Sequence, residues 1–186
     1  MAVVLSGEIT EIVGSLGSGR TSLLTFCLRD TTRRGAIAAL VDTDQAFDPA
    51  SAARAGVDLR RLLWVRCSGR RVAALRAADL LVRCPGFALV GLDLGETPPR
   101  LPLTLAFRLR LAARRTGTAL VILAGRRIAG PGASLALRTT RRALEWTGPA
   151  SVPTRLARMG TTVQVVRRRG GLHALTVPDA TWWWTA

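Results

Sequence analysis

The sequence contains no lysine, and all 27 of its basic side chains are arginine. Acidic side chains are also scarce, with 12 among 186 residues, which leaves a formal net charge of +15 at pH 7. We attribute the missing lysine to a coding bias, whereas the shortage of acid has a physical consequence. A positive field of this size attracts phosphate backbones or acidic protein surfaces. The alternative interpretation is a solvated basic surface without a dedicated partner.

Long apolar runs and a secretory signal are absent too. No run of about 18 apolar residues occurs, so the sequence predicts no transmembrane helix. The N-terminus lacks a charged segment followed by an apolar one. Cys27, Cys67 and Cys84 have no C-x-x-C spacing, and the single histidine, His173, has no partner pattern, which argues against a zinc site. These absences predict reduced thiols in a cytoplasmic protein.

An alternation of buried strands and helices runs through the first two thirds of the chain. Continuous apolar runs are typical of strands covered on both faces, and apolar residues three or four apart are typical of helices. The alternation predicts an α/β fold with a mostly parallel central sheet flanked by helices. After the β-prone residues Ile9, Ile12 and Val13, the predicted strands are 36–41, 62–67, 87–93 and 119–124, and the predicted helices are 21–29, 70–82 and 103–115.

The pattern changes after residue 124. Residues 125–132 are rich in arginine and glycine, which predicts a loop. Residues 163–166 and 172–177 are β-prone and flank the pair Gly170-Gly171. This arrangement predicts a C-terminal antiparallel hairpin.

A glycine-rich turn follows the first β-prone run. It reads Gly14-Ser15-Leu16-Gly17-Ser18-Gly19-Arg20-Thr21, and a helical pattern comes next. Strand, glycine loop and helix in this order form the phosphate-cradling P-loop, whose template is G-x-x-x-x-G-K-[ST]. Gly14, Gly19 and Thr21 fit the template, but Arg20 replaces its lysine. A guanidinium is bulky and planar, so we expect anion binding to be kept and catalysis to be weakened or lost.

Acidic residues follow two of the predicted strands, where ligands bind in open α/β sheets. Asp42 and Asp44 follow one strand, and Asp93 ends another. In a working site the loop amides bind phosphates and an acid steadies a metal ion. Alternatively, Asp42, Asp44 and Asp48 cap the turn and helix around Pro49. The predicted nucleotide-binding residues are Gly14, Gly17, Gly19, Arg20, Thr21 and Asp48, and the Mg²⁺ ligands of a live site are Thr21 and Asp93.

Residues 7–24 and 41–63 resemble the RecA ATPase core, which implies a RecA-like P-loop fold. On this resemblance Asp44 takes the position of the catalytic glutamate and Asp93 that of the Walker B aspartate, so both are vestigial catalytic candidates. Asp48 matches an acid near the adenine. The positions that depart from the family pattern are Arg20 for lysine, Asp44 for glutamate, Ser51 for an aromatic that stacks on the base, and Gly125 for a glutamine that senses the γ-phosphate.

A short, arginine-rich and degenerate RecA core resembles the ImuA family of the SOS-induced mutagenesis cassette. The loop after Gly125 is shorter than the recombinase's DNA-binding loop. We expect one RecA-like core domain over 1–186, without the recombinase's filament helix and C-terminal domain. The resemblance implies a non-catalytic accessory protein of DNA-damage tolerance, at the nucleoid, that recruits ImuB, RecA and the error-prone polymerase for translesion synthesis.

On this interpretation the protein requires no cofactor and no membrane. Weakly bound ATP with Mg²⁺ is the alternative to a chain without nucleotide. The alternative functions are a DNA-dependent ATPase of the RecA superfamily, a module that binds DNA non-specifically, and a SulA-like cell-division inhibitor.

Two groups of residues are candidates for the binding role. The first holds Arg126 and Arg127, which we expect to contact phosphates, and Arg167 and Arg169, which match two basic residues that reach a neighbour's nucleotide in the recombinase. Without interleaved aromatics we expect no base stacking. The second is Trp182-Trp183-Trp184. Successive strand side chains alternate between faces, so at least one indole is expected to be exposed or to anchor a partner. A terminal strand that caps the core is the alternative.

Overall fold

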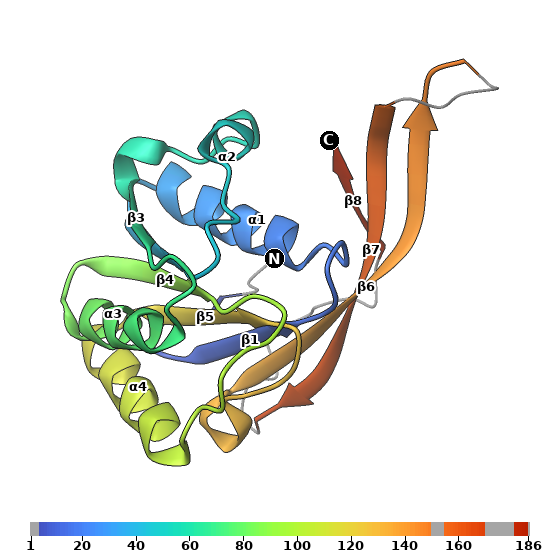
Figure 1. Ribbon diagram of the computed structural model, residues 1–186. Helices are drawn as coiled ribbons and strands as arrows, with labels where there is room; N and C mark the ends of the chain where they lie inside the picture. Colours follow the sequence, from blue (N-terminus) through green and yellow to red (C-terminus); the bar gives the residue numbers. More distant parts are fainter. Residues whose placement is uncertain (1–3, 150–154, 170–180, 186) are drawn as a thin grey trace.

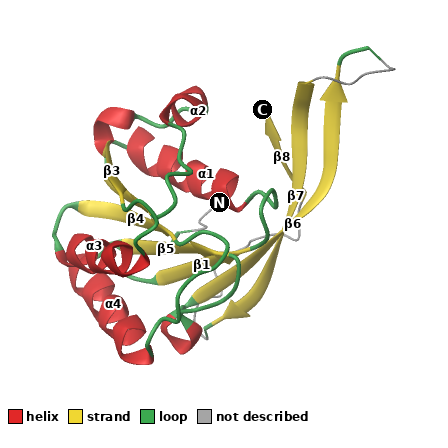
Figure 2. Cartoon of the chain, in the orientation of Figure 1, coloured by secondary structure: helices red, strands yellow, loops and turns green. Residues whose placement is uncertain are grey.

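Eight strands form a single sheet in the computed structural model, which describes residues 4–149, 155–169 and 181–185. Their order across the sheet is β3-β2-β4-β5-β1-β6-β7-β8. The first six are parallel to one another, and β7 and β8 each run antiparallel to the strand before. The predicted α/β fold, with a mostly parallel sheet and antiparallel C-terminal strands, is confirmed (Figures 1 and 2).

The elements follow one another along the chain as β1 (Ile9–Val13), α1 (Arg20–Arg33), β2 (Ile37–Asp42), α2 (Pro49–Arg54), the 3-10 turn η1 (Leu59–Arg61), β3 (Leu62–Arg66), α3 (Arg71–Arg83), β4 (Phe87–Asp93), α4 (Leu103–Thr116), β5 (Ala119–Ala124), the 3-10 turn η2 (Gly130–Gly132), β6 (Leu135–Thr147), β7 (Arg155–Arg168) and β8 (Thr181–Thr185).

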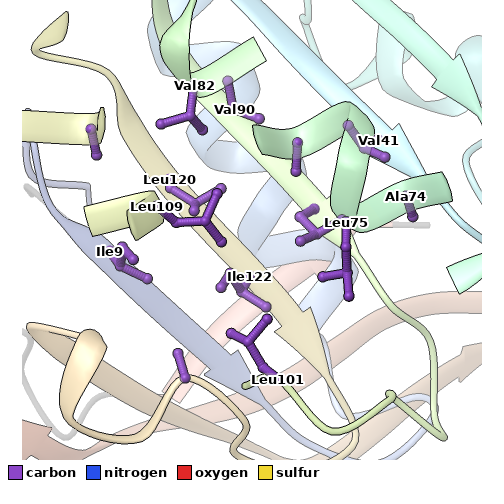
Figure 3. Close-up of a cluster of buried hydrophobic side chains, with 14 of the residues drawn as sticks. Ile9, Val41, Ala74, Leu75, Val82, Val90, Leu101, Leu109, Leu120 and Ile122 are labelled. Atoms are coloured by element: carbon purple, nitrogen blue, oxygen red, sulfur yellow. The ribbon is translucent and has the colours of Figure 1, made fainter. Parts of the chain in front are cut away.

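Helices cover both faces of the central parallel strands, which explains why β2, β4 and β5 are apolar up to the aspartates that end β2 and β4. In β2, Ala39 and Val41 join a core cluster with α3 and α4, whereas Ala38 and Leu40 join a second cluster with α1. Successive side chains of a strand point to opposite faces, so a strand between two helical layers has no polar side. Figure 3 shows the first cluster, where Leu109 of α4 lies against β5.

The helix α1 extends beyond its predicted end at residue 29. It continues to Arg33, and Thr31 and Thr32 are buried within it. The Thr32 hydroxyl donates to the Leu28 carbonyl oxygen at 2.9 Å. A threonine that bonds back to the preceding turn satisfies its polar atom inside a helix, so α1 continues through these threonines beyond the predicted end.

The strand β6 was not predicted, because only its first residues carry a buried-strand signal. Leu135, Ala136 and Leu137 are fully buried, and most of the strand beyond them is exposed. The predicted hairpin strand 163–166 lies within β7, whose described partners are β6 and β8. The predicted turn at Gly170-Gly171 and its second strand lie outside the described residues.

The outer halves of β6 and β7 extend away from the helical layers, as Figure 1 shows. Their inner halves lie across the loop that precedes α1. Within the described ranges, no helix is long and apolar enough to cross a membrane.

Candidate functional site

The glycine-rich loop joins β1 to α1 at the carboxyl end of the parallel strands. Gly17 has a φ of 69° and Gly19 has a φ of 91°, which is the left-handed region that glycine enters without steric cost. The Ser18 amide donates to the Ser15 carbonyl oxygen at 3.1 Å, so the loop turns tightly before the helix begins. Strand, glycine turn and helix thus follow one another as the phosphate-cradling template requires.

Two threonines of the β6–β7 pair press against this loop. Thr139 is 2% exposed, and its hydroxyl lies 2.8 Å from the hydroxyl of Ser18. A Cβ atom on Gly14 would collide with both hydroxyls, and a Cβ atom on Gly19 would collide with the Thr161 side chain. Both template glycines are therefore required by the side chains packed against them, and Gly19 is also required by its positive φ.

Arg20, in the lysine position of the template, is turned back over its own loop. The residue is 5% exposed. Its Nη1 donates to the Gly14 carbonyl oxygen at 2.6 Å and to Glu96 Oε2 at 2.7 Å. The other oxygen of this carboxylate, Glu96 Oε1, accepts from the Leu16 amide at 3.2 Å. Glu96 was missed in the sequence, although it follows the end of β4 by three residues.

The backbone of Glu96 lies directly against Gly125, which follows β5. The Gly125 amide donates to the Gly95 carbonyl oxygen at 3.0 Å. A Cβ atom on residue 125 would lie 3.1 Å from the Glu96 carbonyl carbon and would collide with its oxygen. Glu96 in this position and a side chain at residue 125 therefore exclude each other.

The acids at the end of β2 and just after it have partners within the chain. Asp42 is 1% exposed and accepts from the amides of Ala46 and Phe47 at 3.1 and 3.0 Å, so it holds the turn after β2. Asp44, the vestigial catalytic candidate, lies 3.2 Å from Arg71 Nη2. Arg71 begins α3, and its position beside Asp44 was not expected from the sequence.

Asp93 ends β4 and pairs in register with Asp42, the last residue of β2. Its Oδ1 accepts from the Gly95 amide at 2.9 Å. Burial raises the pKa of the Asp93 carboxyl above its ordinary value of 3.8, and the Gly95 hydrogen bond and the charge of Arg20 only partly oppose the rise. A carboxyl of perturbed pKa at the carboxyl end of a parallel sheet is typical of functional sites.

Asp48 and Thr21, two further candidates, occupy helix starts. Asp48 caps α2, where it accepts from the amides of Ala50 and Ser51 at 3.1 and 3.0 Å. Its described contacts are those of a helix cap, and a role near an adenine stays a prediction. Thr21 is exposed in the first turn of α1. In the described part of the chain, no three His, Cys, Asp or Glu side chains are grouped to hold a metal, so Mg²⁺ binding by Thr21 and Asp93 also stays a prediction.

This arrangement does not fit a magnesium triphosphate in the loop. The Leu16 amide and the Arg20 guanidinium, which would face a phosphate, both bind Glu96. Asp44, which would orient a water molecule, binds Arg71. The chain's own side chains thus occupy these three groups.

Arg126 and Arg127 lie beside the loop, as neighbours of Gly125. Together with Arg138 of β6 they line a hollow of about 460 Å³ that reaches Gly14. Arg127 forms an ion pair on the core side of the hollow, because its Nε lies 3.5 Å from an oxygen of the fully buried Glu11. The hollow therefore presents several guanidinium groups next to the glycine loop.

Arg167 lies near the C-terminal end of β7, and Arg169 follows the last residue of this strand. Arg167 donates to the Gly130 carbonyl oxygen at 3.1 Å, and the Arg169 amide donates to the Ser134 carbonyl oxygen at 2.9 Å. The structure does not bring these two arginines to the hollow lined by Arg126 and Arg127, and an intersubunit role for them stays a prediction.

Trp184 is half-buried and packs on the core cluster that contains α1. Its Nε1 donates to the Thr161 hydroxyl at 3.0 Å, which connects β8 to the residue that covers Gly19. These contacts are those of a strand that caps the core. The side chains of Trp182 and Trp183 lie outside the described ones, and partner binding by the three tryptophans stays a prediction.

Part of the chain is similar in sequence to RecA proteins. The RecA protein of Chlorobaculum tepidum is 39% identical over 88 residues, 47% of this chain and 25% of that protein. The RecA protein of Clavibacter michiganensis is 40% identical over 87 residues, 47% of this chain and 24% of that protein. The matched segment therefore spans about a quarter of the length of these relatives.

A solved structure resembles nearly the whole chain. The RadB recombinase aligns with 98% of this chain and 88% of its own, with a TM-score of 0.62 and 18% identity, which shows a common fold. The model of the RecA N-terminal domain matches residues 2–96, just over half of the chain. The chain therefore belongs to the RecA N-terminal domain family.

Proposed function

We propose that this chain is a RecA-like accessory protein of the ImuA type, which recruits proteins for SOS-induced translesion DNA synthesis and does not act through nucleotide hydrolysis. The contacts of Arg20 and Asp44 support the second half of this proposal. Both residues depart from the family pattern, and both form ion pairs within the chain. Electrostatic stabilisation of a phosphoryl transfer needs charges that are free to face the transferred group.

One observation carries the recruiting role: an apolar and basic surface over α3 and α4, which lie side by side on one face of the sheet (Figure 1). The large apolar side chains of this α3–α4 surface are Val72, Leu80, Leu103, Phe107 and Leu111, which are 63%, 70%, 53%, 44% and 52% exposed. The exposed arginines of the same two helices are Arg76, Arg83, Arg108, Arg114 and Arg115.

The charge of the α3–α4 surface identifies the kind of partner that it fits. The one acid of the two helices, Asp79, is bonded to Arg83 and Arg108 at 3.1 and 3.3 Å. Between the helices, Leu111 and Arg115 line a hollow of about 340 Å³. A nucleic-acid backbone offers no apolar group to contact exposed leucine and phenylalanine. An acidic protein segment with apolar anchors complements both the apolar side chains and the positive charge of this surface. The proposed partners, ImuB, RecA and the error-prone polymerase, would dock such a segment here.

Binding measurements with the purified partners test this role. Phe107→Ala with Leu111→Ala removes two apolar contacts, and we expect the affinity for the bound partner to fall about tenfold or more. Trp146→Ala is the matched control, because Trp146 is 51% exposed on the outer part of β6. Absence of binding to all three proteins, or equal affinity of the double variant and the wild type, would refute recruitment through this surface.

Turnover of ATP that Asp93→Ala abolishes would instead support the alternative function, a DNA-dependent ATPase.

The hollow lined by Arg126, Arg127 and Arg138 favours a second candidate function, non-specific DNA binding. Guanidinium groups that neutralise phosphates release counterions, so the affinity for DNA should fall steeply with salt. Arg126→Ala with Arg138→Ala should flatten that dependence. If the wild type binds no DNA at about 150 mM salt, a concentration near the physiological one, the basic charge serves protein partners alone.

A further inference from the structure

The carboxylate of Glu96 binds the glycine loop at two points. Oε2 accepts from Arg20 Nη1 at 2.7 Å, and Oε1 accepts from the Leu16 amide at 3.2 Å. The loop leads into the N-terminus of α1, where backbone amides and the helix dipole favour a negative charge. A charged side chain and a loop amide thus converge on one anion, and that anion belongs to the chain itself.

The burial of Arg20 makes this anion necessary. The Arg20 side chain is 6% exposed, whereas that of Glu96 is 41% exposed. A buried guanidinium without a counter-charge is costly, and the Glu96 carboxylate supplies that charge from the solvent side. An anion from solution must displace Glu96 to reach both groups, and a tethered carboxylate acts at a high effective concentration.

Gly125 allows Glu96 to take this position. The Gly125 amide binds the Gly95 carbonyl oxygen, and a Cβ atom on residue 125 would collide with the Glu96 backbone. Two residues that are 29 positions apart in the sequence therefore act together, since a side chain at 125 would push the segment that carries Glu96 away from the loop.

We infer that Glu96 is the internal ligand of the P-loop and closes it against polyphosphates, with Gly125 as the residue that permits the closure. Removal of the Glu96 charge exposes an anion site formed by Arg20 and the Leu16 amide. The ligands of the opened loop are pyrophosphate and the phosphates of a nucleotide. The inference concerns the loop alone and does not depend on recruitment of a protein partner.

Calorimetric titration with inorganic pyrophosphate, in the absence of metal, tests this closure. Glu96→Gln keeps the shape of the side chain and removes its charge, so the affinity for pyrophosphate should rise about tenfold or more as the competing tethered ligand is lost. Glu145→Gln is the matched control. Glu145 is also 41% exposed and paired with an arginine, Arg158, but lies far along β6. This variant should bind pyrophosphate as weakly as the wild type.

Two further variants separate the closure from a general change in charge. Arg20→Ala added to Glu96→Gln should cancel the gain, because the opened site loses its cation. Gly125→Ala should reproduce part of the gain with Glu96 still present. Circular dichroism establishes that each variant is folded. If Glu96→Gln fails to fold, the pyrophosphate affinity of Gly125→Ala decides whether Glu96 closes the loop. Folded Glu96→Gln protein with wild-type affinity for pyrophosphate would overturn the inference, as would an equal gain in Glu145→Gln.

Discussion

The hydroxyl of Thr139 in β6 lies 2.8 Å from the hydroxyl of Ser18 in the glycine loop. The two residues are 121 positions apart in the sequence and both are buried. This contact places the β6–β7 pair over the loop and buries the end of the loop, residues 18–20. Substitutions in the loop should therefore act on the stability of the whole sheet.

Gly19→Ala tests this packing. Alanine in a left-handed conformation costs roughly 1–2 kcal/mol, and the collision with Thr161 should add about 1–3 kcal/mol for overpacking. Gly35→Ala is the control, since Gly35 has a φ of 81° and nothing within 4 Å of an added Cβ. Urea unfolding should show the larger loss for Gly19→Ala. Equal losses would mean that β7 does not press on the loop.

Asp93→Asn should raise the melting temperature at pH 7. Burial raises the pKa of Asp93 in the folded state above 3.8, so the folded protein holds this proton more tightly than the unfolded chain. The stability linked to this proton is fully present below pH 3.8 and is lost as the pH rises through the folded-state pKa. Asparagine is never ionised and its side-chain oxygen can still accept from Gly95, so it avoids that loss.

The pH dependence of the melting temperature separates this effect from simple repacking. The advantage of Asp93→Asn should shrink as the pH is lowered toward 4. Asp48→Asn should behave in the opposite way, because hydrogen bonds from Ser51 lower the pKa of Asp48 in the folded state. Its contribution is present above pH 3.8 and is lost as the pH falls through the folded-state pKa. A pH-independent difference for Asp93→Asn would contradict the burial argument.

Cys84 should be the one thiol that reacts quickly with a disulfide reagent in the folded protein. It is exposed, whereas Cys27 and Cys67 are buried. Burial raises the pKa of the Cys27 thiol to about 12 and also raises that of Cys67, so neither supplies thiolate at neutral pH. Reaction in guanidinium chloride should release all three thiols, and Cys84→Ser should remove the fast phase. A fast phase that survives in Cys84→Ser would show that one buried thiol is accessible.

Glu11→Ala should destabilise the protein strongly. Glu11 is fully buried in β1, and its Oε1 accepts from the amides of Ile128 and Ala129 at 2.7 Å each. Alanine leaves these amides without a partner and Arg127 without a counter-charge, a loss of about 3–5 kcal/mol. Glu11→Gln, which keeps an acceptor, should lose less. Hydrogen exchange at Ile128 and Ala129 should accelerate in the alanine variant, and unchanged exchange would show that Glu11 does not hold this loop.

Most of the parallel sheet could be predicted because its signals are local. The runs in β2, β4 and β5 are apolar up to the aspartates that end β2 and β4, since helices cover both sides of these strands. The strand β6 could not be predicted, because most of it is exposed and polar and its pairing with β7 extends beyond the helical layers. The predicted end of α1 at residue 29 was wrong, because the Thr32 hydroxyl bonds to the preceding turn and the helix continues.

The sequence by itself determined the glycine loop, the replacement of lysine by Arg20 and the family to which the loop belongs, because these lie within one short segment. Only the tertiary structure decided what Arg20 does. Its partner Glu96 is 76 positions away, and Gly125, which makes room for Glu96, lies on another strand end. A guanidinium in a P-loop can bind a phosphate or a carboxylate of its own chain, and that choice depends on which groups the folded sheet brings within reach.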